Sequence, residues 1–225
     1  MGERRTCKSY YFSVEGETEK WYLEHLRKLI NSSEKAVYSV KFIVKINKDP
    51  REMVKALPFI GEITVNHICD IESNSDEHIR IFRKTLDDMK SACLMGKKVS
   101  YQLGYSNYAF DLWIALHKVD CGTPLSDRKQ YLKFLQDGFK EPFNSMNEYK
   151  KEDNFKRCLN KITLDDVLTA IERAEKIMVG NQSSGYKPVK YKKFAYYTEN
   201  PSLSVHEIIS GILKECKLLP NYQSA

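Results

Sequence analysis

The stretch CKSYYFSVEGETE, residues 7–19, decides the fold of the first half of the chain. Residues 7–15 are rich in aromatic and other β-compatible side chains, which predicts a strand that stops at Gly16. A helix is predicted directly after it, over residues 18–30, because apolar residues recur there on one helical face. Glycine permits the tight turn between the two elements. The stretch is therefore predicted to be a strand-to-helix unit.

The same alternation continues as far as residue 118. Further strands are predicted over residues 37–46, 63–69 and 98–103, and the helices that follow them over residues 50–57, 77–95 and 107–117. Strands that alternate with helices form a mostly parallel sheet covered by helices. We therefore expect residues 1–118 to form an α/β core around a four-stranded parallel sheet.

The strand signal fades beyond His117. Helices are predicted over residues 128–139 and after two expected N-cap residues, Thr163 and Ser204. The polar residues 140–161 are predicted to be a loop. We expect residues 119–225 to form a mainly helical extension that packs on the core.

The composition excludes several classes of protein. With 225 residues, 42% hydrophobic and 12% aromatic, the chain can bury a full core and is not predicted to be disordered. It has no apolar run near the ~18 residues of a membrane span and no signal-peptide pattern, so we expect a cytoplasmic protein without a membrane partner. The six cysteines form no CxxC pair and are expected to be free thiols. A net charge of +6 permits a nucleic-acid partner without requiring one.

Acidic residues follow two of the predicted strands. Glu15 ends the first strand, and Asp70 and Glu72 end the third. Because parallel strands end at a shared edge, we expect the three carboxylates to converge. Carboxylate oxygens suit Mg²⁺, which predicts a metal site there. The plainer alternatives are a strand-to-helix turn capped by Thr18 and a solvated acidic loop.

The segment SNYAFDLWIALH, residues 106–117, is predicted to be a helix with two distinct faces. Its aromatic residues recur at helical spacing and are expected in the core. Asn107 and Asp111 are four residues apart and so lie together on another face. Because they follow the fourth strand, they are further candidates for the site.

The stretch GYKPVKYKKFAYY, residues 185–197, holds four lysines and five aromatic residues but no acid. This pattern suits a single-stranded nucleic acid, because lysines neutralise phosphates while rings stack on bases. The candidate contacts are Lys187, Lys190, Tyr191, Lys192, Lys193 and Phe194. The alternative is an extended segment whose rings pack on the core while its lysines face water.

Taken together, these motifs resemble the RloB-like (AbiLii) family of bacterial proteins, which have a Toprim-like domain and are linked to restriction loci and abortive phage infection. The matching motifs are Glu-Gly-x-Thr-Glu at 15–19, the acidic pair at 70 and 72, Ser-Asn-x-x-Phe-acid-x-Trp-x-x-x-His at 106–117, and Asn-Pro-Ser-Leu-Ser-Val-His at 200–206. The resemblance touches most of the chain, although each motif is short.

The resemblance implies a Toprim-like fold and a nuclease that acts on RNA or DNA with Mg²⁺ (or Mn²⁺), in anti-phage defence, with a second defence-system protein as a further partner. Glu15 would be the general acid/base and, with Asp70 and Glu72, a metal ligand. Two departures matter: Glu72 stands where the family has Asp, and Asn107-Tyr-Ala-Phe-Asp111 where it has Asn-Pro-x-Phe-Glu. The alternative is a non-catalytic Toprim-like module that binds nucleic acid or protein. A small-molecule phosphotransferase lacks support, because the chain has no glycine-rich phosphate loop.

Overall fold

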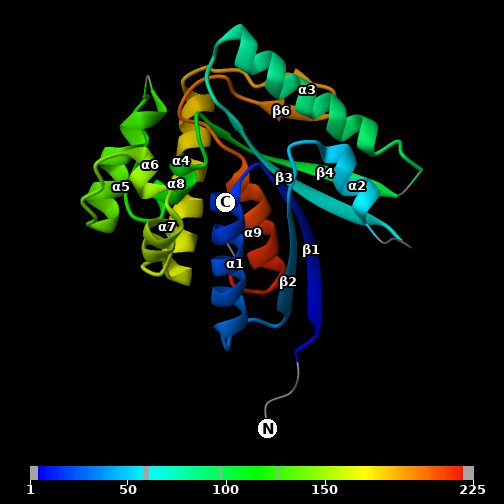
Figure 1. Cartoon of the computed structure of the whole chain (residues 1–225), viewed down its shortest axis with the longest axis horizontal. Helices are drawn as coiled ribbons and strands as arrows, with labels where there is room; N and C mark the ends of the chain where they lie inside the picture. The colour runs from blue at the N-terminus through cyan, green and yellow to red at the C-terminus, as the bar shows by residue number, and fades with distance from the viewer. Residues whose placement is uncertain (1–4, 58–60, 97, 126, 220–225) are drawn as a thin grey trace.

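The computed structural model describes residues 5–57, 61–96, 98–125 and 127–219. Its centre is a parallel sheet of four strands in the order β2-β1-β3-β4 (Figure 1). The strands are β1 (Cys7–Val14), β2 (Ser39–Ile46), β3 (Ile63–Ile71) and β4 (Val99–Asn107). This confirms the α/β fold with a four-stranded parallel sheet that the alternation of elements predicts.

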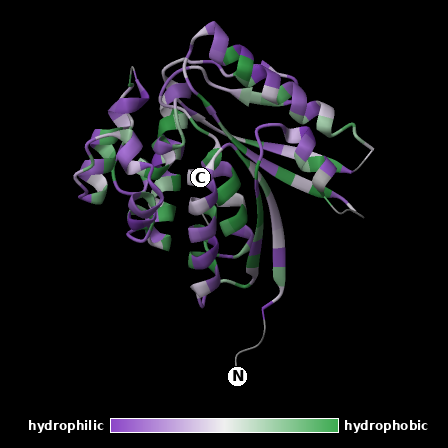
Figure 2. Ribbon diagram, in the orientation of Figure 1, coloured by the Kyte–Doolittle hydropathy of each residue, from purple (hydrophilic) through white to green (hydrophobic). Residues whose placement is uncertain are grey.

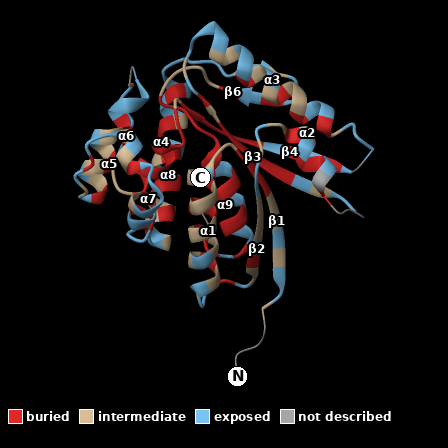
Figure 3. Cartoon of the chain, viewed as in Figure 1, coloured by how far each residue is buried: buried red, intermediate tan, exposed pale blue. Residues whose placement is uncertain are grey.

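Helices cover both faces of the sheet. One face packs against α2 (Pro50–Ala56), α3 (Asp76–Ala92) and a two-stranded hairpin, β5 (Val189–Tyr191) with β6 (Phe194–Tyr196). The other face packs against α1 (Glu17–Ser32) and α9 (Val205–Glu215). Buried residues concentrate in the strands and on the sides of the helices that meet them, and these sides are apolar (Figures 2 and 3). Within the described ranges, no helix is both long and apolar enough to cross a membrane.

Beyond the sheet the chain is mainly helical, as predicted. The elements here are α4 (Asp111–Leu116), the 3₁₀ turn η1 (Arg128–Gln130), α5 (Tyr131–Phe139), α6 (Met146–Tyr149), α7 (Glu152–Leu159) and α8 (Leu164–Ser183). One hydrophobic cluster joins Phe12 of β1, Trp113 of α4 and Ile171 of α8. The extension therefore shares its core with the α1 face of the sheet, while a domain boundary at residue 118 stays a prediction.

The prediction of a loop over residues 140–161 is wrong, because this segment contains α6 and α7. The side chain of Ser145 caps α6 by accepting a hydrogen bond from the backbone N–H of Glu148. Tyr149 and Phe155 are fully buried, with ring centroids 5.4 Å apart. These helices are too short for an apolar period to stand out in the sequence, and burial of a few rings stabilises them instead.

Two strands are longer than predicted, which changes the setting of the candidate residues. β3 continues to Ile71, so Asp70 lies within a paired strand, and β4 continues to Asn107. The helix predicted from Asn107 begins only at Asp111, because Tyr108 has a φ of 66°, outside the helical region. Asn107 and Asp111 therefore do not share a helix face, and this part of the prediction is wrong.

The three predictions of helix N-caps have different outcomes. Thr163 caps α8 as expected, in a capping box with Asp166. Thr18 does not cap α1, whose N-cap is Gly16. Ser204 is the N-cap of α9, but its hydroxyl makes no cap hydrogen bond and instead donates to the carbonyl of Leu103 in β4. The hydroxyl of Ser204 therefore binds the neighbouring strand instead of capping its own helix.

Three histidines are buried in the core: His67 in β3, His117 after α4 and His206 in α9. Burial lowers the pKa of each to about 4, because the imidazolium ion would lose its hydration. In the unfolded chain the same side chains titrate near pH 6.5. The native state must therefore keep them neutral.

We predict that each buried histidine makes the protein less stable as the pH falls from 6.5 toward 4. Below pH 6.5 the unfolded state binds a proton at each of these positions that the native state does not bind, so the contribution of each histidine to the free energy of unfolding is largest above that pH. Between pH 7.5 and 5.5 this contribution should fall by about 1 kcal/mol for each histidine. Urea unfolding of the wild type and of His206→Gln at the two pH values isolates the contribution of one histidine. The change in the free energy of unfolding between the two pH values should differ between the two proteins by that amount, and equal changes would contradict the assignment.

Candidate functional site

Glu15 and Asp70 meet at the carboxyl edge of the sheet. Glu15 follows the last residue of β1, and Asp70 lies near the end of the neighbouring strand β3. The backbone N–H of Asp70 donates a hydrogen bond to Oε2 of Glu15 over 3.3 Å. The Oδ1 atom of Asp70 is buried and has no hydrogen-bond partner among the described residues. Parallel pairing has thus brought the two predicted carboxylates together and left one oxygen unused.

Both residues line a cavity of about 350 Å³ to which Glu72 also contributes. Its lining also includes Lys48, which follows β2, and Lys84 of α3, which is paired with Asp88 over 2.8 Å. The three predicted carboxylates therefore share one cavity, which also has basic side chains in its lining. A small, charged ligand suits such a cavity better than an apolar one.

Glu72 is held differently from Glu15 and Asp70. It is half exposed, and its Oε2 lies 3.6 Å from Nε2 of His78 and 3.7 Å from a guanidinium nitrogen of Arg128. Such exposed pairs contribute little to stability, on the order of 0–1 kcal/mol. Glu72 can therefore exchange these partners for another cation at small cost.

A second pair of carboxylates lies behind Asp70. Glu19 of α1 is 5% exposed and Asp111 of α4 is 2% exposed. Asp111 is paired with Lys150, which follows α6, over 2.9 Å. Thr18 donates a hydrogen bond from its hydroxyl to Oε2 of Glu19 over 3.1 Å. The site thus includes Asp111, which the sequence analysis singled out, and Glu19, which it did not.

Burial and neighbouring carboxylates raise the pKa values of Glu15 and Asp70. Burial is the largest cause for Glu15, with repulsion from Glu19 and Glu72 adding to it, and the pKa of Glu15 rises to about 7. Burial, together with repulsion from Glu19, Glu15 and Asp111, also raises the pKa of Asp70 well above its usual range. A cation placed among them would relieve this repulsion.

Within the described part of the chain, no group of three or more His, Cys, Asp or Glu side chains is arranged to hold a metal ion directly. Mg²⁺, however, usually keeps several waters and binds through only one or two carboxylates. Glu15 and Asp70 supply such a pair of hard oxygen donors, and the unused Oδ1 of Asp70 is free to act as one of them. The residues present therefore fit a hydrated divalent ion.

Comparison with known families gives one finding. The model of the family described as RloB-like protein matches residues 10–212, which is most of the chain and includes both the sheet and the extension. The chain belongs to the RloB-like protein family. No match to it is found among curated proteins or among solved structures. The resemblance seen in the sequence motifs is confirmed.

In this RloB-like chain, Asn107 is placed beside the C-terminal segment rather than in the cavity. It is fully buried, and its side-chain amide donates hydrogen bonds to the backbone carbonyls of Tyr197 and Glu199. The amide therefore holds that segment against the end of β4. Its candidate role in catalysis stays a prediction.

The lysine and aromatic stretch forms the β5–β6 hairpin over α3. Phe194 is 7% exposed, and Tyr196 packs on Phe82 of α3 with ring centroids 4.9 Å apart. Tyr191 donates a hydrogen bond from its hydroxyl to Asp87 over 2.9 Å, and Lys192 pairs with the same carboxylate over 3.3 Å. Phe194 and Tyr196 therefore pack as the plainer alternative expects, and a buried Phe194 offers no face to a base.

Sequence reasoning noted Glu19 as the end of the motif at 15–19 but gave it no role in the site, and it missed Lys150. Glu19 could have been found, because it falls on the apolar stripe of α1 with Tyr22, Leu26 and Ile30, where an acid is unusual. Lys150 lies in a polar stretch that was predicted to be a loop, and nothing in the local pattern separates it from its neighbour Lys151. Only folding of the extension onto the sheet brings its ammonium group to Asp111.

We predict that Asp70→Asn makes the metal-free protein more stable, by about 1 kcal/mol, because it removes one buried like charge. The backbone N–H that binds Glu15 is unchanged. Thermal melts without metal measure the gain, and melts with Mn²⁺ should show a smaller rise in Tm for the variant than for the wild type. Asp137→Asn, an exposed change on α5, is the control. A clear loss of stability without metal would make Asp70 a structural hydrogen-bond acceptor instead.

Proposed function

We propose that this RloB-like chain is a metal-dependent phosphodiesterase of the Toprim type that cleaves RNA or DNA, with Mg²⁺ or Mn²⁺ as its cofactor. The observation that carries the proposal is the meeting of Glu15 and Asp70 at the carboxyl edge of a parallel sheet, with one buried oxygen of Asp70 left without a partner. Ligands of α/β sheets bind at this edge. The anti-phage role rests on membership of the family alone.

Glu15 and Asp70 would hold the metal ion, and Glu72 would join them on giving up its weak pairs. When bound, the ion would neutralise charge on the scissile phosphate and activate a water molecule. Glu15, which carries a proton part of the time near neutral pH, would move a proton to or from the reacting oxygens. Lys48 in the cavity lining would attract the phosphates that bare carboxylates repel, as would Lys84 on giving up its exposed pair with Asp88.

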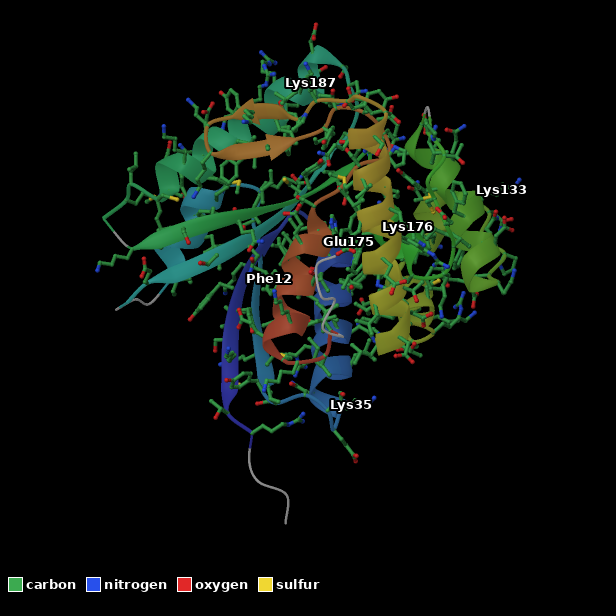
Figure 4. The ribbon with its side chains drawn as sticks, turned by 180° about the vertical axis from the view of Figure 1, so that it is seen from behind. Phe12, Lys35, Lys133, Glu175, Lys176 and Lys187 are labelled. Carbon is green, nitrogen blue, oxygen red and sulfur yellow. The ribbon has the colours of Figure 1, made fainter. Side chains whose placement is uncertain are left out.

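The lysines of the hairpin would guide the nucleic acid toward the cavity. Lys187 and Lys190 are exposed, and Lys187 lies beside the hairpin (Figure 4). The hairpin packs on α3, and α3 also forms one wall of the cavity. A strand lying along this side of the molecule would therefore approach the carboxylates with its phosphates neutralised.

We predict that replacing Lys187 and Lys190 with alanine weakens binding of single-stranded nucleic acid equally for all sequences. Two lost phosphate contacts should lower the slope of log K against log salt concentration by about 1.4. Fluorescence anisotropy across a salt series measures this slope. Lys133→Ala with Lys176→Ala, two exposed lysines on α5 and α8 away from the hairpin, is the matched control (Figure 4). An unchanged slope in the Lys187/Lys190 variant would remove the guiding role.

A non-catalytic, nucleic-acid or protein binding module is the second candidate function. Two observations favour it: Glu72 is already paired with Arg128 and His78, and the described residues contain no ready-made metal cluster of three side chains. The two candidates differ in their response to metal. A true metal site must raise the melting temperature in Mn²⁺, whereas a binding module need not.

We predict that the protein cleaves RNA or DNA in the presence of Mn²⁺ and that Glu15→Gln reduces the rate by 10²- to 10⁴-fold, the usual contribution of a general acid/base. Mixed labelled RNA and DNA substrates, separated on denaturing gels, measure cleavage. Glu17→Gln is the control, because Glu17 is an exposed acid two residues away whose only described ion pair is with Lys20. An unchanged cleavage rate in Glu15→Gln would contradict the assignment of Glu15 as the general acid/base. Absence of cleavage of any substrate, with no metal-induced stabilisation, would favour the binding module.

A further inference from the structure

The carboxylates near Asp70 fall into two groups with different surroundings, an open side and a closed side. On one side is the open cavity, which Asp70 shares with Glu15 and Glu72. On the other side are Glu19 and Asp111, which are 5% and 2% exposed. The open side has room for a ligand, while the closed side already holds a cation, the ammonium group of Lys150.

Lys150 is held in place by the fold around it. It is the residue that ends α6, and its backbone N–H donates to the carbonyl of Met146 over 2.9 Å. Its neighbour Tyr149 is fully buried between the rings of Phe143 and Phe155, at centroid distances of 5.5 and 5.4 Å. The side chain of Lys150 is 41% exposed, yet its Nζ lies 2.9 Å from Oδ2 of Asp111. The pairing is thus a product of anchored packing rather than of a freely moving surface chain.

The charge of Lys150 acts on more than one carboxylate. Besides its ion pair with Asp111, its ammonium group bears electrostatically on Asp70 and Glu19. An ion pair with a carboxylate as buried as Asp111 is costly to break, because the acid left behind has neither water nor a partner. The closed side therefore depends on a cation at this position.

Two buried polar atoms in the surroundings of these carboxylates have no hydrogen-bond partner among the described residues. The hydroxyl of Tyr149 and Oδ1 of Asp70 are buried atoms for which the described residues supply no hydrogen bond. Asp111 and Glu19 both bear electrostatically on Tyr149, so its hydroxyl belongs to the surroundings of this cluster. A buried hydroxyl and a buried carboxylate oxygen without partners are hard oxygen groups of the kind that a hydrated divalent ion binds.

We propose that the ammonium group of Lys150 takes the place that a second divalent cation would have, so that the site binds one metal ion, on its open side. The proposal rests on the proposed function, because it assumes a metal ion among Glu15, Asp70 and Glu72. Lys150 is then a positioning residue whose charge faces Asp111 and holds that carboxylate in place. The extension supplies this charge to a site that the sheet alone would leave short of one.

The test counts Mn²⁺ ions by isothermal titration calorimetry on the full chain without substrate. The wild type should bind one Mn²⁺, and Lys150→Met should bind two and gain a larger rise in Tm from Mn²⁺, because the metal takes over the lost charge. Lys150→Arg, which keeps the charge, should behave like the wild type. Lys151→Met is the matched control, since Lys151 is the adjacent, exposed lysine and should leave the count at one.

The remaining outcomes of the Mn²⁺ titration each support or contradict the proposal. A count in Lys150→Met equal to that of the wild type would overturn the proposal. If Lys150→Met unfolds without metal, recovery of the folded state in millimolar Mn²⁺ supports the proposal, and failure to recover makes Lys150 a structural ion-pair partner only. A wild type that binds no Mn²⁺ would count against the proposed function itself. In that case one Mn²⁺ in Lys150→Met would still support the role of Lys150, and none would overturn both.

Discussion

The parallel pairing of β3 with β1 on one side and β4 on the other is the constraint on which the rest of the structure depends. Because neighbouring strands run in the same direction, the residues that follow them gather at one edge. Glu15 and Asp70 are 55 positions apart in the chain, yet they meet through a backbone hydrogen bond at this edge. The pairing of the strands, rather than any affinity between two carboxylates, overcomes their mutual repulsion.

Gathering carboxylates in a partly buried place creates an electrostatic problem that the sheet does not solve. Burial and like charge both favour the protonated form of Asp70, as its raised pKa shows. The helical extension provides cations from two directions, Arg128 toward Glu72 and Lys150 toward Asp111. The extension therefore contributes two basic side chains to the acidic edge of the sheet. The family match over residues 10–212 spans both parts of the chain.

The C-terminal segment completes the other end of this arrangement. The hydroxyl of Ser204 accepts a hydrogen bond from the N–H of Tyr105 and donates one to the carbonyl of Leu103, while Asn107 holds the carbonyls of Tyr197 and Glu199. Residues close to the end of the chain thus bind along β4, and α9 follows on the face that Gly104 leaves open. A Cβ at Gly104 would lie 2.7 Å from Cδ1 of Ile208 in α9. The edge strand and the last helix therefore form one packed unit.

The sequence by itself determined the order of strands and helices in the first half of the chain, because apolar period and glycine breaks are local signals. It also pointed to Glu15, Asp70 and Glu72 as candidates, since parallel strands end at a common edge, but the adjacency of β1 and β3 that brings Glu15 to Asp70 was decided by the sheet. It did not determine α6 and α7, which depend on burial of Tyr149 and Phe155, nor the cap of α9, where Ser204 binds β4 instead of its own helix. The partnership of Lys150 with Asp111 depends on the tertiary fold alone. An ion pair between residues 39 positions apart produces no periodic pattern in a sequence. It forms only when the extension packs on the sheet.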